Sequence, residues 1–455
     1  MILVYGLAVA GAATVRALRQ RGFDVIAADD TVDDAKRRLA GDLDVELVAA
    51  PDNSRLADLV AASERVVPAP GVPETHRLFA TARRAGRQVV SELELAYEWE
   101  QDRAAGPRPL VAATGTDGKT TTTLWAVEML AAAGVRAVAA GNTEVPLVAA
   151  IDLDVDAFVV ECTSFRLAWT ETFRADAAAW LNLAPDHLNW HVSMDTYVAA
   201  KARLFTQQRP DDVAIGFAAD PVVMEHLRRA PARQRTFGLT GADYHVAGRG
   251  ERAVLVGPQG ELGPVANLRR ALPHDLTNGL AAAALVLEIG LAGADAVASG
   301  LASFVGPPHR IELVGESGGV RWYNDSKATT PHAASVAIRA FDRVVLIAGG
   351  LNKGLDLAPM AAEVARVATV VAIGEAAPDI EATFAGAAPV VTAGSMAEAV
   401  EQAGAAARPG EVVLLSPGCA SFDWYPDGGY PARGDDFRRL VQERLANVNA
   451  SSGAA

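Results

Sequence analysis

Short apolar runs alternate with stretches of helical periodicity along most of the chain. The first run is residues 2–5, followed by a glycine-containing turn, a helical stretch to Gln20 and a second apolar run over residues 24–28. Apolar runs of about four to eight residues that alternate with helices are typical of βαβ units around a parallel sheet. The pattern therefore predicts an α/β fold.

Two breaks rich in proline and glycine interrupt this alternation, at Gly106-Pro107 and at Gly306-Pro307-Pro308. A chain of 455 residues also exceeds the size at which one hydrophobic core keeps growing. We therefore predict three α/β domains, over residues 1–106, 107–306 and 307–455.

The charge and the cysteine content narrow the class of protein. A formal charge of -14 argues against broad binding to nucleic acid or to an anionic membrane. Cys162 and Cys419 lie far apart and show no metal-type spacing, which fits a reducing compartment. No apolar run is long enough to span a bilayer. We expect a cytoplasmic protein, monomeric, without nucleic-acid or membrane partners.

Lysine is rare, since only five of the forty-one basic residues are lysine and the rest are arginine. Lysine is a compact ammonium that can lose its proton, whereas arginine is a permanently charged planar fork. Retained lysines are therefore candidates for specific chemistry. For Lys36, in a charged stretch, we accept chance; the others are Lys119, Lys201, Lys327 and Lys353.

The strongest local signal is a glycine-rich loop between an apolar run over residues 110–113 and a helical stretch over residues 122–133. Backbone N–H groups of such a loop attract phosphate, the lysine reaches the outer phosphates, and the following hydroxyl can ligate Mg²⁺. The alternative is a purely structural glycine turn. The candidate phosphate-binding residues are Gly115, Thr116, Asp117, Gly118, Lys119, Thr120 and Thr121.

Three further candidates follow in the same block. Glu161 ends an apolar run and suits a Mg²⁺ ligand, although a surface acid or an ion-pair partner is an equal alternative. His187 follows Asp186 after another apolar run, where it can hold metal or substrate or be structural. Lys201 lies in a helical stretch, where a solvated position would be expected to carry arginine in this chain.

In the third block, Lys327 and Lys353 each follow an apolar run, where they can grip anionic groups. The segment over residues 414–423 ends another run, and its backbone and hydroxyls can bind a carboxylate.

In their order along the chain, these segments resemble those of the Mur ligases of peptidoglycan synthesis, most closely the branch that adds D-glutamate to UDP-N-acetylmuramoyl-L-alanine. The distinguishing segments are residues 114–121, 161–165, 186–188, 197–201, 308–310, 325–329, 349–354, 416–423 and 433–435. The resemblance implies an N-terminal Rossmann-like domain for UDP, a central P-loop ATPase-type domain and a C-terminal Rossmann-like domain that binds glutamate. It also implies an ATP- and Mg²⁺-dependent amide ligase with an acyl-phosphate intermediate.

The resemblance further implies roles for single residues. Lys119, Glu161, His187 and Lys201 would be catalytic, with Lys201 as a carbamate, and the metal ligands would be Thr120, Glu161, His187 and Lys201. Besides the glycine-rich loop, the residues around ATP would be Asn142, Asn278, Arg310, Asp325 and Lys327. Those around glutamate would be Thr329, Lys353, Ser416 and Phe422.

The chain departs from the family pattern at Asp117, Glu144, Thr163, Arg166 and Asn189. The segment over residues 424–432 is also about two residues longer than usual, next to the implied glutamate pocket. The amino acid, D- or L-glutamate, is therefore the most open assignment.

Two other classes remain open. Folylpolyglutamate synthetases share the phosphate loop and the carbamylated lysine but typically lack the N-terminal nucleotide domain. A non-catalytic nucleotide-binding protein is disfavoured, because Lys119, Glu161, His187 and Lys201 are all present.

Overall fold

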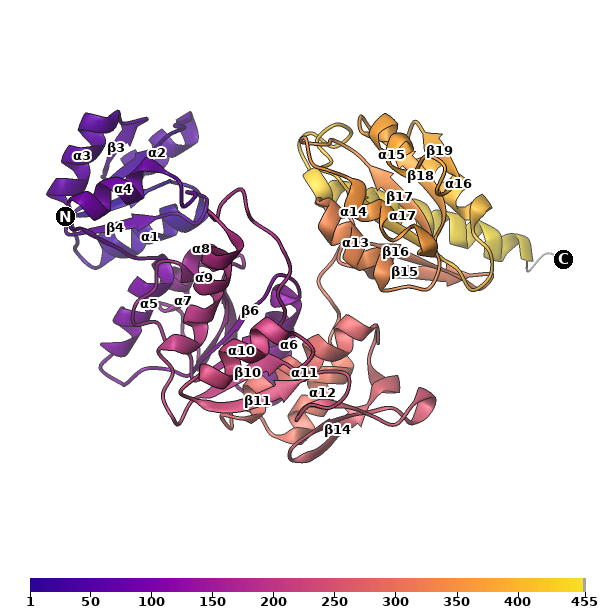
Figure 1. Cartoon of the computed structure of the whole chain (residues 1–455), viewed down its shortest axis with the longest axis horizontal. Helices are drawn as coiled ribbons and strands as arrows, with labels where there is room; N and C mark the ends of the chain where they lie inside the picture. The colour runs from indigo at the N-terminus through magenta and orange to yellow at the C-terminus, as the bar shows by residue number, and fades with distance from the viewer. Residues whose placement is uncertain (453–455) are drawn as a thin grey trace. The chain divides into compact units, whose positions relative to one another are not determined.

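The computed structural model describes residues 1–452, with side chains to residue 448. The chain divides into two compact units, Met1–Phe304 and Val305–Ala455, of which residues 453–455 lie outside the described part (Figure 1). None of the described helices is long and apolar enough to cross a membrane.

The first unit opens with a five-stranded parallel sheet. Its strand order is β3 (Glu46–Ala49), β2 (Val25–Asp29), β1 (Ile2–Tyr5), β4 (Arg65–Pro68) and β5 (Gln88–Val89). The connecting helices are α1 (Val9–Gln20), α2 (Asp34–Asp42), α3 (Asn53–Ala62) and α4 (Arg77–Arg84). The predicted βαβ unit is present, with β1 at the predicted residues and α1 ending at Gln20.

Lys36, to which no role was assigned, pairs with the acid that ends β2. Its Nζ donates hydrogen bonds to Asp29 Oδ2 at 2.7 Å and to the Thr31 carbonyl at 2.6 Å. The Leu7 N–H donates to the same Asp29 oxygen at 2.7 Å. The ion pair therefore joins the end of β2 to the glycine turn after β1.

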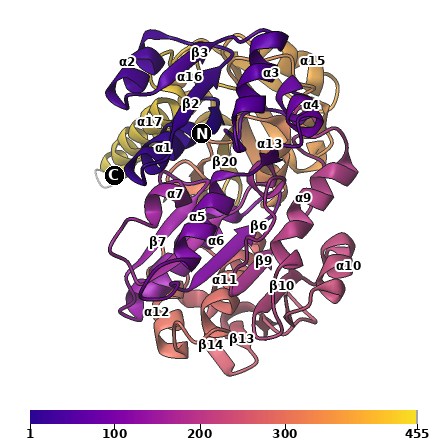
Figure 2. The same cartoon turned by 90° about the vertical axis from the view of Figure 1, so that its left-hand side faces the viewer.

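A six-stranded parallel sheet forms the centre of the first unit (Figure 2). Its order is β11 (Arg233–Phe237), β10 (Val213–Phe217), β9 (Ala177–Trp180), β6 (Leu110–Thr114), β8 (Ala157–Glu161) and β7 (Ala137–Gly141). The helices of this part are α5 (Glu92–Gln101), α6 (Lys119–Ala132), α7 (Leu147–Ala150), α8 (Ser164–Leu167), α9 (Met194–Thr206), α10 (Pro221–Arg229), α11 (Pro273–Leu287) and α12 (Ala294–Ser303).

Both faces of this sheet are covered, which explains the continuous apolar runs of its strands. Successive side chains of β6 point to opposite faces. Val111 and Ala113 pack in one core with α6 and α11, whereas Leu110 and Ala112 pack in another with α5 and α7. Because β6 is fully buried, the glycine-rich loop at its end starts from a rigid element.

A small antiparallel sheet in this unit was not predicted. It consists of β12 (His245–Ala247), β13 (Val254–Gly257) and β14 (Gly260–Pro264). β12 and β14 contain few apolar residues, so no apolar run marks them, and β13 by itself gives no sign of an antiparallel sheet.

The second unit contains a six-stranded sheet that is parallel except for its β15–β16 pair. Its order is β15 (Glu312–Ser317), β16 (Val320–Asn324), β20 (Val412–Gly418), β17 (Val344–Gly349), β18 (Val367–Ile373) and β19 (Val390–Ala393). The helices are α13 (Pro331–Arg339), α14 (Ala358–Ala361), α15 (Ala377–Phe384), α16 (Met396–Ala406) and α17 (Gly429–Ser452).

Candidate functional site

The glycine-rich loop joins the carboxyl end of β6 to the start of α6. The helix begins at Lys119, earlier than predicted, because Gly118 turns the chain with a φ of 82°. A Cβ atom at Gly118 would lie 2.4 Å from Asn278 Oδ1 of α11. Only glycine therefore fits between the loop and Asn278. Thr120 and Thr121 lie in the first turn of α6, where N–H groups attract phosphate.

The loop is held by Asn182, which follows β9 and was not among the predicted site residues. Its Oδ1 accepts hydrogen bonds from the Thr116 N–H at 3.0 Å and the Asp117 N–H at 2.9 Å. The Thr116 hydroxyl lies 3.0 Å from the Tyr197 hydroxyl of α9. Side chains from two neighbouring elements thus preorganise the loop.

Two lysines converge on one carbonyl oxygen of this loop. Lys119 Nζ donates to the Gly115 carbonyl at 2.9 Å and to the Thr116 carbonyl at 2.8 Å. Lys201 Nζ, from α9, donates to the same Gly115 carbonyl at 2.7 Å. The loop therefore gathers two amines where a phosphate would bind.

Lys201 differs from an ordinary lysine because its side chain is buried. Its exposure is 1%, and Nζ lies 4.6 Å from the centre of the Tyr197 ring. Among the described residues, no carboxylate forms an ion pair with it. Burial, and next the charge of Lys119, lower the pKa of Lys201 well below its usual value. A neutral amine in this position is a nucleophile, which arginine would not be.

Glu161 ends β8 beside Asn142, and one of its oxygens lacks a partner. Asn142 Nδ2 donates to Glu161 Oε1 at 2.8 Å. Glu161 Oε2 is buried and accepts no hydrogen bond from any residue that the structure describes. A buried carboxylate oxygen without a partner is costly, so a cation is the expected partner.

His187 lies in the loop after β9 with a positive φ of 57°. Its ring is 4.7 Å from that of Phe165, and Asp186 lies 3.2 Å from its Nε2. Burial lowers the pKa of His187, and Asp186 opposes this while Lys119 and Lys201 add to it. The imidazole is thus kept neutral, the form that binds metals.

In the second unit, two of the predicted nucleotide residues, Asp325 and Lys327, follow β16, and Arg310 lies just before β15. Asp325 accepts a hydrogen bond from the Ser416 hydroxyl at 2.7 Å and from the Ile311 N–H at 3.2 Å. Arg310 lies between two residues with positive φ, and the Lys327 N–H donates to the His309 carbonyl at 3.1 Å. Ser416 is fully buried, so its hydroxyl serves to hold Asp325.

The remaining predicted residues of this unit lie on loops after the strands. Lys353 Nζ is 5.1 Å from the centre of the Phe422 ring, which is half exposed. Thr329 follows Lys327, and its N–H donates to the Lys327 carbonyl at 2.9 Å. Lys353 and Phe422 thus form a cation–π pair that is open to solvent.

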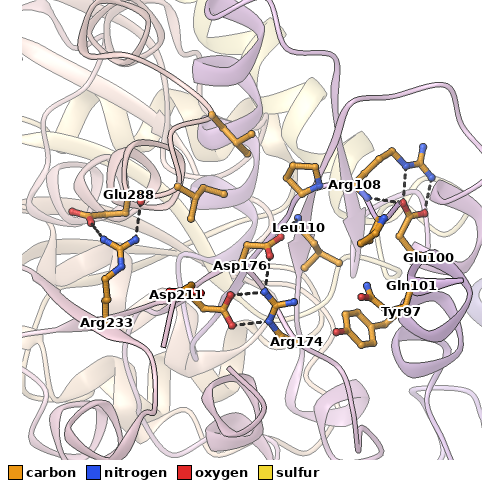
Figure 3. Close-up of a pocket in the computed structure, with 15 residues that line it drawn as sticks. Tyr97, Glu100, Gln101, Arg108, Leu110, Arg174, Asp176, Asp211, Arg233 and Glu288 are labelled. Carbon is orange, nitrogen blue, oxygen red and sulfur yellow. Dashed lines mark hydrogen bonds and ion pairs between the residues drawn. The ribbon is translucent and has the colours of Figure 1, made fainter. Parts of the chain in front are cut away.

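A cavity of about 490 Å³ lies at the amino ends of the central strands, whereas the glycine-rich loop lies at their carboxyl ends (Figure 3). It is lined by Leu110, Asp176 and Asp212, which stand at the amino ends of parallel strands. Most of its charges are paired with one another, with Arg174 at 2.6 Å from Asp212 and Arg108 at 2.7 Å from Glu100. The cavity is therefore separate from the phosphate loop, and its ion pairs serve stability.

We expect Asp212→Ala to destabilise the protein by about 3 kcal/mol, because it leaves Arg174 without its closest partner in a mostly buried site. Asp212 also accepts from the Arg209 N–H at 2.6 Å, which the change removes. Urea unfolding measures the effect. The matched control is Glu225→Ala, which breaks the exposed pair with Arg229 and should leave the midpoint unchanged.

Comparison with known proteins gives the family. Residues 113–286 match the Mur ligase middle domain, and residues 309–419 match the Mur ligase glutamate ligase domain. The UDP-N-acetylmuramoylalanine--D-glutamate ligase of Frankia casuarinae is 41% identical, over 97% of this chain and 94% of its own. That of Myxococcus xanthus is 39% identical, over 97% of this chain and 98% of its own.

The fold agrees with these matches. The crystal structure of a MurF ligase from Thermotoga maritima in complex with ADP has a TM-score of 0.59 at 17% identity and covers 84% of this chain and 96% of its own. The two proteins therefore share an α/β fold with parallel sheets. The chain belongs to the Mur ligase family.

Proposed function

We propose that this protein is an ATP-dependent amide ligase that adds D-glutamate to UDP-N-acetylmuramoyl-L-alanine in peptidoglycan precursor synthesis. The observation that carries the proposal is the meeting of Lys119 and Lys201 at the Gly115 carbonyl of the glycine-rich loop. The names of the relatives with 41% and 39% identity support the substrate pair.

The residues present fit Mg²⁺ and ATP. Among the described residues, no three His, Cys, Asp or Glu side chains form a metal cluster. A nucleotide-bound Mg²⁺ needs no such cluster, because phosphates and water complete its coordination around one or two protein carboxylates. Thr120 and the unpartnered Oε2 of Glu161 would hold one Mg²⁺, and His187 with carbamylated Lys201 a second. When bound, these ions offset the charge of the phosphates.

The chemistry follows in two steps. The terminal carboxylate of the first substrate attacks the γ-phosphorus of ATP, and the bond to ADP breaks. The amine of glutamate then attacks the acyl carbon, loses a proton, and phosphate leaves. Lys119 and the loop N–H groups stabilise the charge that develops on the transferred phosphoryl group. Gly118, which fits closely against Asn278, keeps those groups in place.

We assign the glutamate-binding residues to the second unit. Lys353 supplies a positive charge for a substrate carboxylate, and Phe422 packs beside it. Asp325, held by Ser416, and Lys327 bind the nucleotide with Arg310. We retain residues 1–106, 107–306 and 307–455 as functional domains for UDP, ATP and glutamate. We also propose a monomer in the cytoplasm, which gel filtration and cell fractionation test.

Phosphate release tests the proposal. Purified protein is incubated with ATP, Mg²⁺, UDP-N-acetylmuramoyl-L-alanine and either enantiomer of glutamate. We expect release with D-glutamate and none with L-glutamate. Release with L-glutamate alone would move the assignment to a ligase for the other enantiomer, and no release with either would refute the activity. A panel of other amino acids is the specificity control.

A further inference from the structure

A chain of hydrogen bonds runs from α5 to Glu161. Arg166 Nε, in α8, donates to Glu92 Oε1 of α5 at 2.9 Å. Its Nη1 donates to Asn142 Oδ1 at 2.8 Å, and Asn142 Nδ2 donates to Glu161 Oε1 at 2.8 Å. Glu92, Arg166 and Glu161 are all buried, with exposures of 2%, 6% and 1%. This relay of four side chains ends on the carboxylate that has an unpartnered oxygen.

The relay has only one possible direction. Arginine donates hydrogen bonds and accepts none, whereas a carboxylate accepts. An asparagine amide can be turned either way. With Arg166 on one side, the Asn142 oxygen has to face the guanidinium, so the Asn142 NH₂ group has to face Glu161. Glu92 holds Arg166 in place, and it also accepts from the Val148 N–H at 3.2 Å.

The direction of the relay decides whether Glu161 meets a hydrogen-bond donor or an acceptor on Asn142. Oε1 is occupied by Asn142, and Oε2 stays buried without a partner. If the amide were reversed, its oxygen would face a carboxylate oxygen and the two would repel. The carboxylate would then turn, and its second oxygen would no longer be presented in a fixed position.

We propose that Arg166 is a positioning residue: it orients the Asn142 amide so that Glu161 presents Oε2 to Mg²⁺. The inference rests on the proposed function for the identity of the ion, but it concerns metal binding and not turnover. Groups that contact a metal ligand directly, as Asn142 contacts Glu161, commonly change metal affinity by about 10- to 100-fold when they are replaced. Arg166 acts one step further out, through Asn142, so the lower end of that range is expected for it.

The test measures the binding of Mn²⁺ to the protein in the presence of ADP. Electron paramagnetic resonance of Mn²⁺ detects the free and the bound ion. We expect Arg166→Met to raise the dissociation constant for Mn²⁺ about tenfold, because the Asn142 amide is no longer oriented. Arg166→Gln, which keeps a donor, should weaken binding less. In turnover assays, the activating Mg²⁺ concentration should rise while the KM for glutamate stays unchanged.

The matched control is Arg65→Met. Arg65 pairs with Glu98 of the same helix α5, in a partly buried site without a link to Asn142. It should bind Mn²⁺ as the wild type does. Equal weakening in Arg65→Met and Arg166→Met would overturn the inference, and so would wild-type affinity in Arg166→Met.

Arg166→Met leaves Glu92 buried without its partner, which can prevent folding. The double variant Glu92→Gln/Arg166→Met removes both charges. It should fold and still bind Mn²⁺ weakly; wild-type binding by the double variant would refute the positioning role. If the wild-type protein binds Mn²⁺ with ADP but releases no phosphate, the proposed function fails while the inference stands.

Discussion

Replacing Lys119 by methionine is expected to lower kcat by about 10³-fold, since one electrostatic stabiliser of a transition state is commonly worth two to three orders of magnitude. Lys119 Nζ donates to the Gly115 and Thr116 carbonyls at 2.9 and 2.8 Å, so the ammonium lies within the loop that would hold the phosphates. A methionine keeps most of the length of the side chain and removes the charge. Steady-state phosphate release measures the loss.

The comparison variant is Lys119→Arg, which keeps the charge but replaces a compact ammonium by a planar fork. The loop is close-packed, because a Cβ at Gly115 would lie 3.0 Å from Leu181 Cβ. We therefore expect Lys119→Arg to lose most of the activity too, although less than Lys119→Met. Unchanged thermal unfolding would show that both variants are folded. A kcat of Lys119→Met within a few-fold of the wild type would contradict the assigned role.

The phosphate loop and the strand ends were predictable because their signals are local. The sequence places Gly118 and Lys119 between an apolar strand and a helix. A glycine at such a turn can adopt a positive φ, as Gly118 does. Likewise, Glu161 follows an apolar run, so its place at the carboxyl edge of a parallel sheet follows from the fold class.

The groups that hold these residues were not predictable. Asn182 contacts the loop across sixty-six residues of sequence, and Arg166 meets Glu92 across seventy-four. Such pairs depend on the order of the strands in the sheet and on the direction of each side chain. Local sequence patterns carry no information about either. Lys36 differs, because its partner Asp29 is only seven residues away, but that contact depends on the conformation of the turn after β2, which the sequence pattern does not give.

Replacing Lys201 by arginine is expected to abolish activity as fully as replacing it by methionine, with a loss of about 10³-fold or more. A neutral amine attacks the carbon of CO₂, forms an N–C bond and releases one proton, which leaves an anionic carbamate. Burial and Lys119 lower the pKa of Lys201, so the neutral amine is available. Arginine keeps its proton and cannot follow this route.

The low pKa also has a consequence for stability. In the CO₂-free protein, the unfolded chain binds a proton on Lys201 at pH values where the folded protein does not. Stability therefore rises as the pH rises toward the usual lysine pKa, and Lys201→Met should lack this part of the slope. Thermal unfolding over a pH series measures the difference between the two proteins.

Direct detection of the carbamate separates this role from a purely electrostatic one. Carbon-13 NMR of protein equilibrated with labelled bicarbonate should show a carbamate signal in the wild type that is absent from Lys201→Met. Arg203→Lys, an exposed change on the same helix α9, is the control and should retain both the signal and the activity. Arg203 lies two residues away, yet it has no part in the loop contacts of Lys201. An active wild-type enzyme with a free amine at Lys201 would refute the carbamate. The role of Lys201 would then belong to the unmodified amine.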